Sequence, residues 1–202
     1  DTSFLDLNKS ILKEAGGRWN QPPSEEEILA QKEDFEKEIE ELIKQRTQKS
    51  ELWGWKDPRT SLTIELYLSH LEDPRFIFCH RKPQSIAESL NRRNNMELDK
   101  GKRLTEVYES RLEIFFQEHP NLEKLDLSYE KVTKQPERNV KQISSFLNLG
   151  ATEEQISEAI NFVKPKEKIE KRRGFHKAKQ LAVRPIKLII KGIKETKKIS
   201  EY

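Results

Sequence analysis

Residues 75–89 read Arg-Phe-Ile-Phe-Cys-His-Arg-Lys-Pro-Gln-Ser-Ile-Ala-Glu-Ser, and this stretch decides the fold class of the chain. An apolar run of strand-forming residues ends at the cation Arg81, Pro83 suits the first turn of a helix, and Ser89 follows about two turns later. Open α/β folds bind their ligands at the carboxyl ends of such strands. A guanidinium group holds two phosphate oxygens and a hydroxyl donates to a third, so Arg81 and Ser89 together predict a phosphate site.

Further strands and helices alternate on both sides of this stretch. Short apolar runs predict strands at Leu52–Trp55 and Leu122–Leu127. Ser24, followed three residues later by Glu27, is typical of a capping box that opens a helix. This alternation predicts an α/β domain around a mostly parallel sheet. Besides the helix that Pro83 opens, apolar spacing predicts helices over residues 1–15, 24–47, 60–71, 104–117, 139–147 and 152–162.

The composition indicates one helix-rich globular domain. With 202 residues the chain is long enough for one domain with a substantial core but short for two. An apolar fraction of 34% beside a charged fraction of 36% requires a compact core to coexist with well-solvated helices. The single cysteine, Cys79, lies in an apolar run, which predicts a buried thiol, excludes an internal disulfide and favours a cytoplasmic location. No apolar stretch reaches the length of a membrane span.

Charge is distributed unevenly along the chain. Residues 164–202 hold 14 Lys and Arg against 4 Asp and Glu, whereas residues 1–163 hold 24 against 31. We interpret residues 164–183 as a basic loop and residues 184–202 as a basic amphipathic helix. Two interpretations of this tail stay open: it binds an anion, including weak contact with an anionic membrane, or it folds back on the acidic body. We expect no nucleic-acid partner.

Several motifs together resemble one enzyme family. They are Trp-Gly-Trp-Lys-Asp-Pro-Arg-Thr at residues 53–60, the stretch 75–83 with Ser89, and Leu-Ser-Tyr-Glu at residues 127–130. This set resembles the sulfotransferases that use 3′-phosphoadenosine-5′-phosphosulfate (PAPS), most of all the bacterial branch that acts on small molecules or glycans. The resemblance runs from near residue 1 to about Gly174. It implies a P-loop-type three-layer α/β domain over residues 1–163, with helices on both faces of the sheet.

The resemblance also implies roles for individual residues. Arg81 and Ser89 match the pair that binds the 3′-phosphate of PAPS. Lys56 matches the catalytic lysine that contacts the bridging oxygen and the transferring sulfuryl group. Arg172, Arg173 and Gly174 match a late basic-basic-glycine motif that also reaches the 3′-phosphate, while Tyr129 and Glu130 match a family hallmark whose role we interpret as structural. No metal is implied.

The chemistry of sulfuryl transfer is compatible with these residue types. Negative charge builds on the leaving phosphate oxygen during in-line displacement, and a positioned cation such as Lys56 stabilises that transition state more than the ground state. A lysine also donates a proton to a leaving group, which an arginine does not. The acceptor hydroxyl needs a general base. We predict that Asp57 and Arg59 pair with each other and fix the turn after Lys56.

The chain departs from the family in one respect. The Gly/Ser/Thr-rich phosphate-binding loop that follows the first strand in the family is not found in residues 1–202. We therefore expect the first strand and its loop to be missing from the N-terminal side of the chain. The alternative is a non-catalytic relative that serves as an anion-binding or membrane-surface module. A small-molecule kinase would need a Walker-type lysine loop, and no such loop is present in the sequence.

Overall fold

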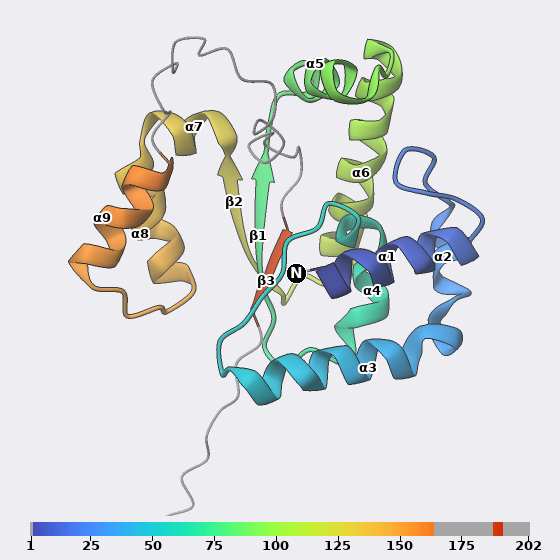
Figure 1. Cartoon of the computed structure of the whole chain (residues 1–202), viewed down its shortest axis with the longest axis horizontal. Coiled ribbons are helices and arrows are strands. Elements are labelled where there is room, and N and C mark those ends of the chain that lie inside the picture. Colours follow the sequence, from blue (N-terminus) through green and yellow to red (C-terminus); the bar gives the residue numbers. More distant parts are fainter. Residues whose placement is uncertain (1, 164–187, 192–202) are drawn as a thin grey trace, which may run out of the picture. The chain divides into compact units, whose positions relative to one another are not determined.

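The computed structural model describes residues 2–163 and 188–191 of the chain (Figure 1). They fall into two compact units: residues 2–76, 107–124 and 188–191 form the first, and residues 77–106 and 125–163 form the second. In chain order the elements are α1 (Thr2–Glu14), α2 (Glu25–Leu29), α3 (Lys32–Lys49), α4 (Thr60–Leu68), β1 (Arg75–His80), α5 (Pro83–Asn94), α6 (Leu98–Glu118), β2 (Glu123–Ser128), α7 (Tyr129–Lys134), α8 (Pro136–Phe146), α9 (Glu153–Val163) and β3 (Leu188–Lys191).

The strands form a small sheet with the order β2-β1-β3. β1 and β2 lie side by side and point in the same direction (Figure 1). The chain between them forms α5 and α6, because two parallel neighbours need a long crossover connection. Phe76, Ile77 and Phe78 in β1 are all buried, which is typical of a strand covered on both faces. A helix-rich α/β architecture is thus confirmed, and the full three-layer, P-loop-type form stays a prediction.

In the first unit, α1 contacts both α3 and α4 (Figure 1). The buried face of α1 includes Phe4, Leu7, Ile11 and Leu12, as its apolar spacing predicts. α4 is buried over most of its length, so it shows little amphipathic pattern. The capping box at the start of α2 is confirmed, since the Glu27 N–H donates to Ser24 Oγ (3.1 Å) and the Ser24 N–H donates to Glu27 Oε2 (2.6 Å).

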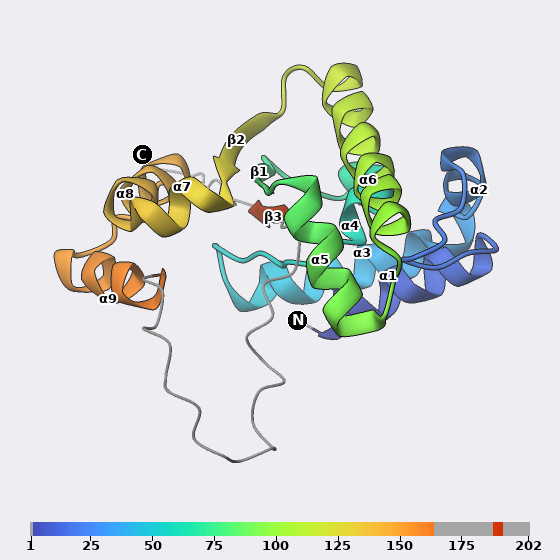
Figure 2. The same ribbon diagram turned by 90° about the horizontal axis from the view of Figure 1, so that it is seen from above.

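In the second unit, α5 approaches the first turn of α6 closely. A Cβ atom on Gly101 of α6 would lie 2.9 Å from the Ala87 Cα of α5, so this helix pair requires glycine there. Ile86 and Leu90 are buried, and α5 ends at Asn95 in the left-handed conformation with φ of 52°. Farther along the chain, α8 contacts both α7 and α9 (Figure 2).

Three expectations about local structure were wrong. The single helix expected over residues 24–47 is divided into α2 and α3 near Gln31, which has φ −84° and ψ 0°. No strand extends over Leu52–Trp55, where Trp53 forms only a single β-bridge and the Trp53 and Trp55 rings join an aromatic stack with the Phe4 ring. Cys79 is only partly buried, because it lies near the end of β1.

The basic tail supplies a further correction. Residues 188–191 form the strand β3, so the helix expected over residues 184–202 is wrong for this stretch. The physical reason is pairing with the distant strand β1, which the β-branched residues Ile189 and Ile190 suit. The rest of that segment and the basic loop over residues 164–183 lie outside the described residues. In the part of the chain that the structure describes, no helix has the length and apolar character needed to cross a membrane.

Candidate functional site

Arg81 directly follows the last residue of β1 and precedes α5, as the sequence predicts. Its guanidinium carbon lies 4.8 Å from the centroid of the Tyr129 ring, a cation–π contact with the first residue of α7. The side chain is half-buried, and its Nε is buried and makes no hydrogen bond with the described residues. A buried N–H without an acceptor is unfavourable, and a bound anion would satisfy it.

Glu130 holds the backbone beside Arg81. The Lys82 N–H donates to Glu130 Oε1 (3.5 Å), and the Ser128 hydroxyl donates to Glu130 Oε2 (3.0 Å). Ser128 also caps α7, because its Oγ accepts from the Lys131 N–H (3.4 Å). Burial opposes ionisation of Glu130, but hydrogen bonds from its own N–H, from Ser128 and from Lys82 outweigh burial and lower the pKa of Glu130. These contacts agree with the structural role expected for the Tyr129-Glu130 pair.

The helix that follows Arg81 carries the predicted serine. Pro83 occupies the first turn of α5, where its missing N–H removes no helical hydrogen bond. Ser85 and Ser89 lie one turn apart on the same side of α5, and both are half-buried. The N–H groups of the first turn of α5 add further donors next to Arg81 and favour negative charge. Donors of three kinds, the guanidinium, the hydroxyls and the amides, are therefore available on this short segment.

His80, the last residue of β1, contacts the neighbouring strand. Its Nε2 lies 2.7 Å from Asp126 Oδ1 of β2, and its ring packs against Phe78 with centroids 3.9 Å apart. Both partners are about half exposed. The pair joins the two strands near their carboxyl ends, which is a structural role.

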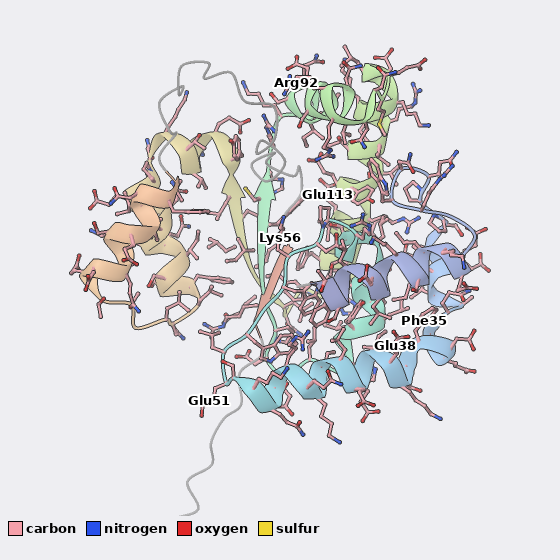
Figure 3. The ribbon with its side chains drawn as sticks, in the orientation of Figure 1. Phe35, Glu38, Glu51, Lys56, Arg92 and Glu113 are labelled. Atoms are coloured by element: carbon pink, nitrogen blue, oxygen red, sulfur yellow. The ribbon has the colours of Figure 1, made fainter. Side chains whose placement is uncertain are left out.

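Lys56 lies on the segment that leads from α3 to α4 in the first unit (Figure 3). Its side chain is half-buried, whereas the next residue, Asp57, is 1% exposed. Asp57 Oδ1 accepts from the Arg59 guanidinium (2.8 Å) and from the Arg59 N–H (3.2 Å). The prediction that Asp57 and Arg59 pair locally and fix this turn is therefore confirmed.

A buried asparagine holds the other side of Asp57. Asn8 of α1 donates through Nδ2 to Asp57 Oδ2 (3.2 Å) and to Thr60 Oγ1 (3.1 Å). Its Oδ1 accepts from the hydroxyls of Thr63 (2.7 Å) and Tyr67 (2.9 Å), both on α4. Sequence reasoning missed Asn8. The available signal was an amide placed among apolar residues on the buried face of α1.

Aromatic rings support the residue before Lys56. The Trp55 ring is stacked on the Phe4 ring with centroids 4.1 Å apart and planes 4° apart. Trp53 extends the stack at 5.8 Å from Trp55. The Trp55 indole N–H donates to Thr60 Oγ1 (2.9 Å). Lys56 is thus placed between two buried and hydrogen-bonded neighbours.

The predicted site residues divide among three places. Lys56 belongs to the first unit, and Arg81 and Ser89 belong to the second. Arg172, Arg173 and Gly174 lie outside the described residues. Within residues 2–163, no group of three or more His, Cys, Asp or Glu side chains is arranged to hold a metal ion.

Comparison with known proteins identifies one family. A family model described as "Sulfotransferase family" matches residues 6–153 of the chain. The matched range is more than half of the 202 residues and includes Lys56, Arg81 and Ser89. Searches of curated proteins and of solved structures found no match.

Proposed function

The chain belongs to the sulfotransferase family, and from this premise we propose that it transfers a sulfuryl group from PAPS to a hydroxyl or amine of a small molecule or glycan. Family membership supports a transferase that moves sulfuryl groups. The arrangement around Arg81 is the observation that supports PAPS as the donor. A half-buried guanidinium with an unsatisfied Nε precedes a helix N-terminus and a stripe of hydroxyls.

The phosphate-binding role of this segment has a physical basis. Tyr129 lies against the guanidinium of Arg81, and the Lys82 N–H is bonded to Glu130, so the segment is ordered before any ligand arrives. Preorganised donors bind an anion with less loss of conformational entropy. We assign the 3′-phosphate of the donor to Arg81 and Ser89, with Arg172, Arg173 and Gly174 as a further contact.

We assign the role of catalytic cation to Lys56. In the proposed reaction the acceptor oxygen or nitrogen forms a bond to sulfur while the bond between sulfur and the bridging oxygen breaks. The electron pair of that bond and a negative charge go to the departing adenosine 3′,5′-bisphosphate, and the acceptor loses its proton to a base. Lys56 would balance the charge on the bridging oxygen, where a compact ammonium is most effective.

The binding of adenosine 3′,5′-bisphosphate tests this proposal. We expect calorimetric titration to give saturable binding to the 202-residue chain, and Arg81→Ala to weaken it at least about tenfold, because a charge-assisted hydrogen bond contributes about 1.5–3 kcal/mol. Arg92→Ala is the matched control, because Arg92 is an exposed arginine at the other end of α5 (Figure 3). It removes the same charge and should leave the affinity within about twofold.

Three results would contradict the proposal. Equal affinities of the wild type and Arg81→Ala would exclude Arg81 from the phosphate site. An equal loss of affinity in Arg92→Ala would show that binding depends on the total positive charge of the protein and not on a specific site at Arg81. Binding without turnover of PAPS in the presence of hydroxyl and amine acceptors would favour the non-catalytic alternative.

A further inference from the structure

The residues on both sides of Lys56 are anchored from elsewhere in the first unit. Trp55, on one side, is stacked on Phe4 of α1 and donates to Thr60 of α4. Asp57, on the other side, accepts hydrogen bonds from Asn8 of α1. The backbone of Lys56 is therefore held at two points by the same pair of helices, although Lys56 itself lies in a segment without regular secondary structure.

Asn8 connects these anchors. It is 0% exposed, and each half of its amide is used twice. The NH₂ group faces the Asp57 carboxylate and the Thr60 hydroxyl oxygen, whereas the carbonyl faces the hydroxyls of Thr63 and Tyr67. A side-chain amide has two donors and an acceptor oxygen with two lone pairs, so this set is complete.

The protonation state of one partner supports this arrangement. Burial first, and then the negative charges of Asp57 and Glu38, raise the pKa of Tyr67 far above its ordinary value. Tyr67 therefore keeps its proton and donates to the Asn8 carbonyl. With the carbonyl held by Tyr67 and Thr63, the NH₂ group is directed at Asp57. An aspartate at position 8 would place a second carboxylate against Asp57, and an apolar residue would remove one hydrogen bond from each of four polar partners.

We propose that Asn8 is a positioning residue for the reaction, because it fixes the Asp57 turn and thereby the location of Lys56. The proposal rests on the proposed function only for its catalytic consequence. The structural part of the proposal is that Asn8 orders residues 55–59. This part depends only on the hydrogen bonds of Asn8 and not on the proposed function. A displacement of a catalytic group by about 1 Å lowers a rate by about 100-fold, so a positioning defect has a measurable effect.

Amide hydrogen exchange tests the structural part without any assay of activity. In Asn8→Ala we expect the amides of Trp55, Lys56, Asp57 and Arg59 to exchange at least about tenfold faster than in the wild type, while the amides of α8 in the second unit keep their rates. Tyr67→Phe is the matched control, because it removes one hydrogen bond from the Asn8 carbonyl and leaves the bond to Asp57. The exchange rates of these four amides in Tyr67→Phe should differ from those of the wild type by less than about threefold.

Either of two exchange results would overturn the inference. One is unchanged exchange of the four amides in Asn8→Ala. The other is equal acceleration in Tyr67→Phe, which would indicate general loosening of the core. If Asn8→Ala does not fold, Asn8→Ser replaces it, because the shorter serine side chain loses the bond to Asp57 but keeps a polar group at this buried position. The same expectation and the same two contrary results apply to Asn8→Ser.

A double-mutant cycle tests the catalytic part. With PAPS turnover measured as release of adenosine 3′,5′-bisphosphate, Asn8→Ala should lower kcat about 10- to 100-fold and change the KM for PAPS much less. In a Lys56→Ala background the same substitution should lower kcat by less than about twofold, because nothing is left to position. Equal losses of kcat in both backgrounds would overturn the positioning role. Full turnover by Lys56→Ala would instead contradict the proposed function of Lys56, and the exchange experiment would still decide whether Asn8 orders the segment.

Discussion

Lys56 and Arg81 are supported by different physical means. The turn after Lys56 is held by a buried carboxylate, a buried amide and hydroxyls from α4, and Asp57 and Asn8 are 1% and 0% exposed. The turn after Arg81 is held by one aromatic ring and by Glu130, both only partly buried. The first arrangement belongs to the core of its unit, and the second lies near solvent.

Under the proposed function, in which Lys56 is the catalytic cation and Arg81 binds phosphate, this difference matches two requirements of a group-transfer enzyme. A catalytic cation requires accurate placement, and buried polar networks enforce one arrangement because every unsatisfied member is costly. A phosphate-binding cation has to release its product, and a partly solvated support keeps binding moderate. We therefore expect substitutions around Lys56 to affect stability first, and substitutions around Arg81 to affect ligand affinity first.

The largest expected effect comes from Asp57→Ala. Removal of the carboxylate leaves the largely buried guanidinium of Arg59 without its partner and leaves an Asn8 N–H unsatisfied. We expect the free energy of unfolding to fall by about 3–5 kcal/mol, measured by urea denaturation. Asp57→Asn keeps the shape and one acceptor and should lose less. A loss below about 1 kcal/mol in Asp57→Ala would contradict the view that this turn is supported by the core.

Gly101→Ala tests whether the helix that carries Ser89 in the second unit is also held by tight packing. The new methyl group would meet the backbone of Ala87 at 2.9 Å on the helix that carries Ser89. Overpacking costs about 1–3 kcal/mol, which exceeds the helix-propensity gain of up to about 1 kcal/mol, so we expect a lower melting temperature. Lys100→Ala, at an exposed neighbouring position, is the control and should be nearly neutral. A stabilised Gly101→Ala would mean that α5 and α6 separate easily.

Tyr129→Ala tests the partly exposed support of Arg81 directly. Loss of the cation–π contact should weaken binding of adenosine 3′,5′-bisphosphate about two- to fivefold, which corresponds to about 0.5–1 kcal/mol. Tyr129→Phe keeps the ring and should bind like the wild type. Calorimetry distinguishes these outcomes, and a Phe variant as weak as the Ala variant would assign the effect to the hydroxyl instead.

The smallest expected effect is a pH dependence from Glu130. Its pKa is lowered in the folded state, so its ionised form adds stability above the ordinary pKa near 4.5, and this contribution disappears as the pH falls through the lowered value. Glu130→Gln should therefore be less stable than the wild type at pH 7, by less than about 0.5 kcal/mol because solvent screens the group. The two proteins should become equal at pH values below the folded pKa. Urea denaturation at several pH values measures this difference, and a constant gap would contradict it.

Much of the local structure was predictable because its causes lie within a few residues. The capping box of Ser24, the proline at the start of α5 and the apolar run of β1 are short-range signals, and each is observed. The prediction for the tail failed because a distant contact decided the outcome. Residues 188–191 belong to the segment expected as an amphipathic helix, yet they pair as an edge strand of the sheet.

The candidate site shows the same division. Arg81 at the end of a strand and the pairing of Asp57 with Arg59 were predictable, since each depends on near neighbours. The contact of Tyr129 with Arg81 and the bond of Lys82 to Glu130 were not, although the Ser-Tyr-Glu motif marked the segment. Those contacts require β2 to lie beside β1, and local residue patterns do not determine which strands become neighbours.

By itself, the sequence determined most of the helices, the strand β1 and which residue types are available for sulfuryl transfer. Only the tertiary structure decided which buried polar groups meet. Asn8 reaches Asp57, Thr60, Thr63 and Tyr67 across sequence separations of 49 to 59 residues. The physical reason is that secondary structure follows from short-range sterics and hydrogen bonding, whereas a buried amide finds its partners only when packing brings α1 and α4 together.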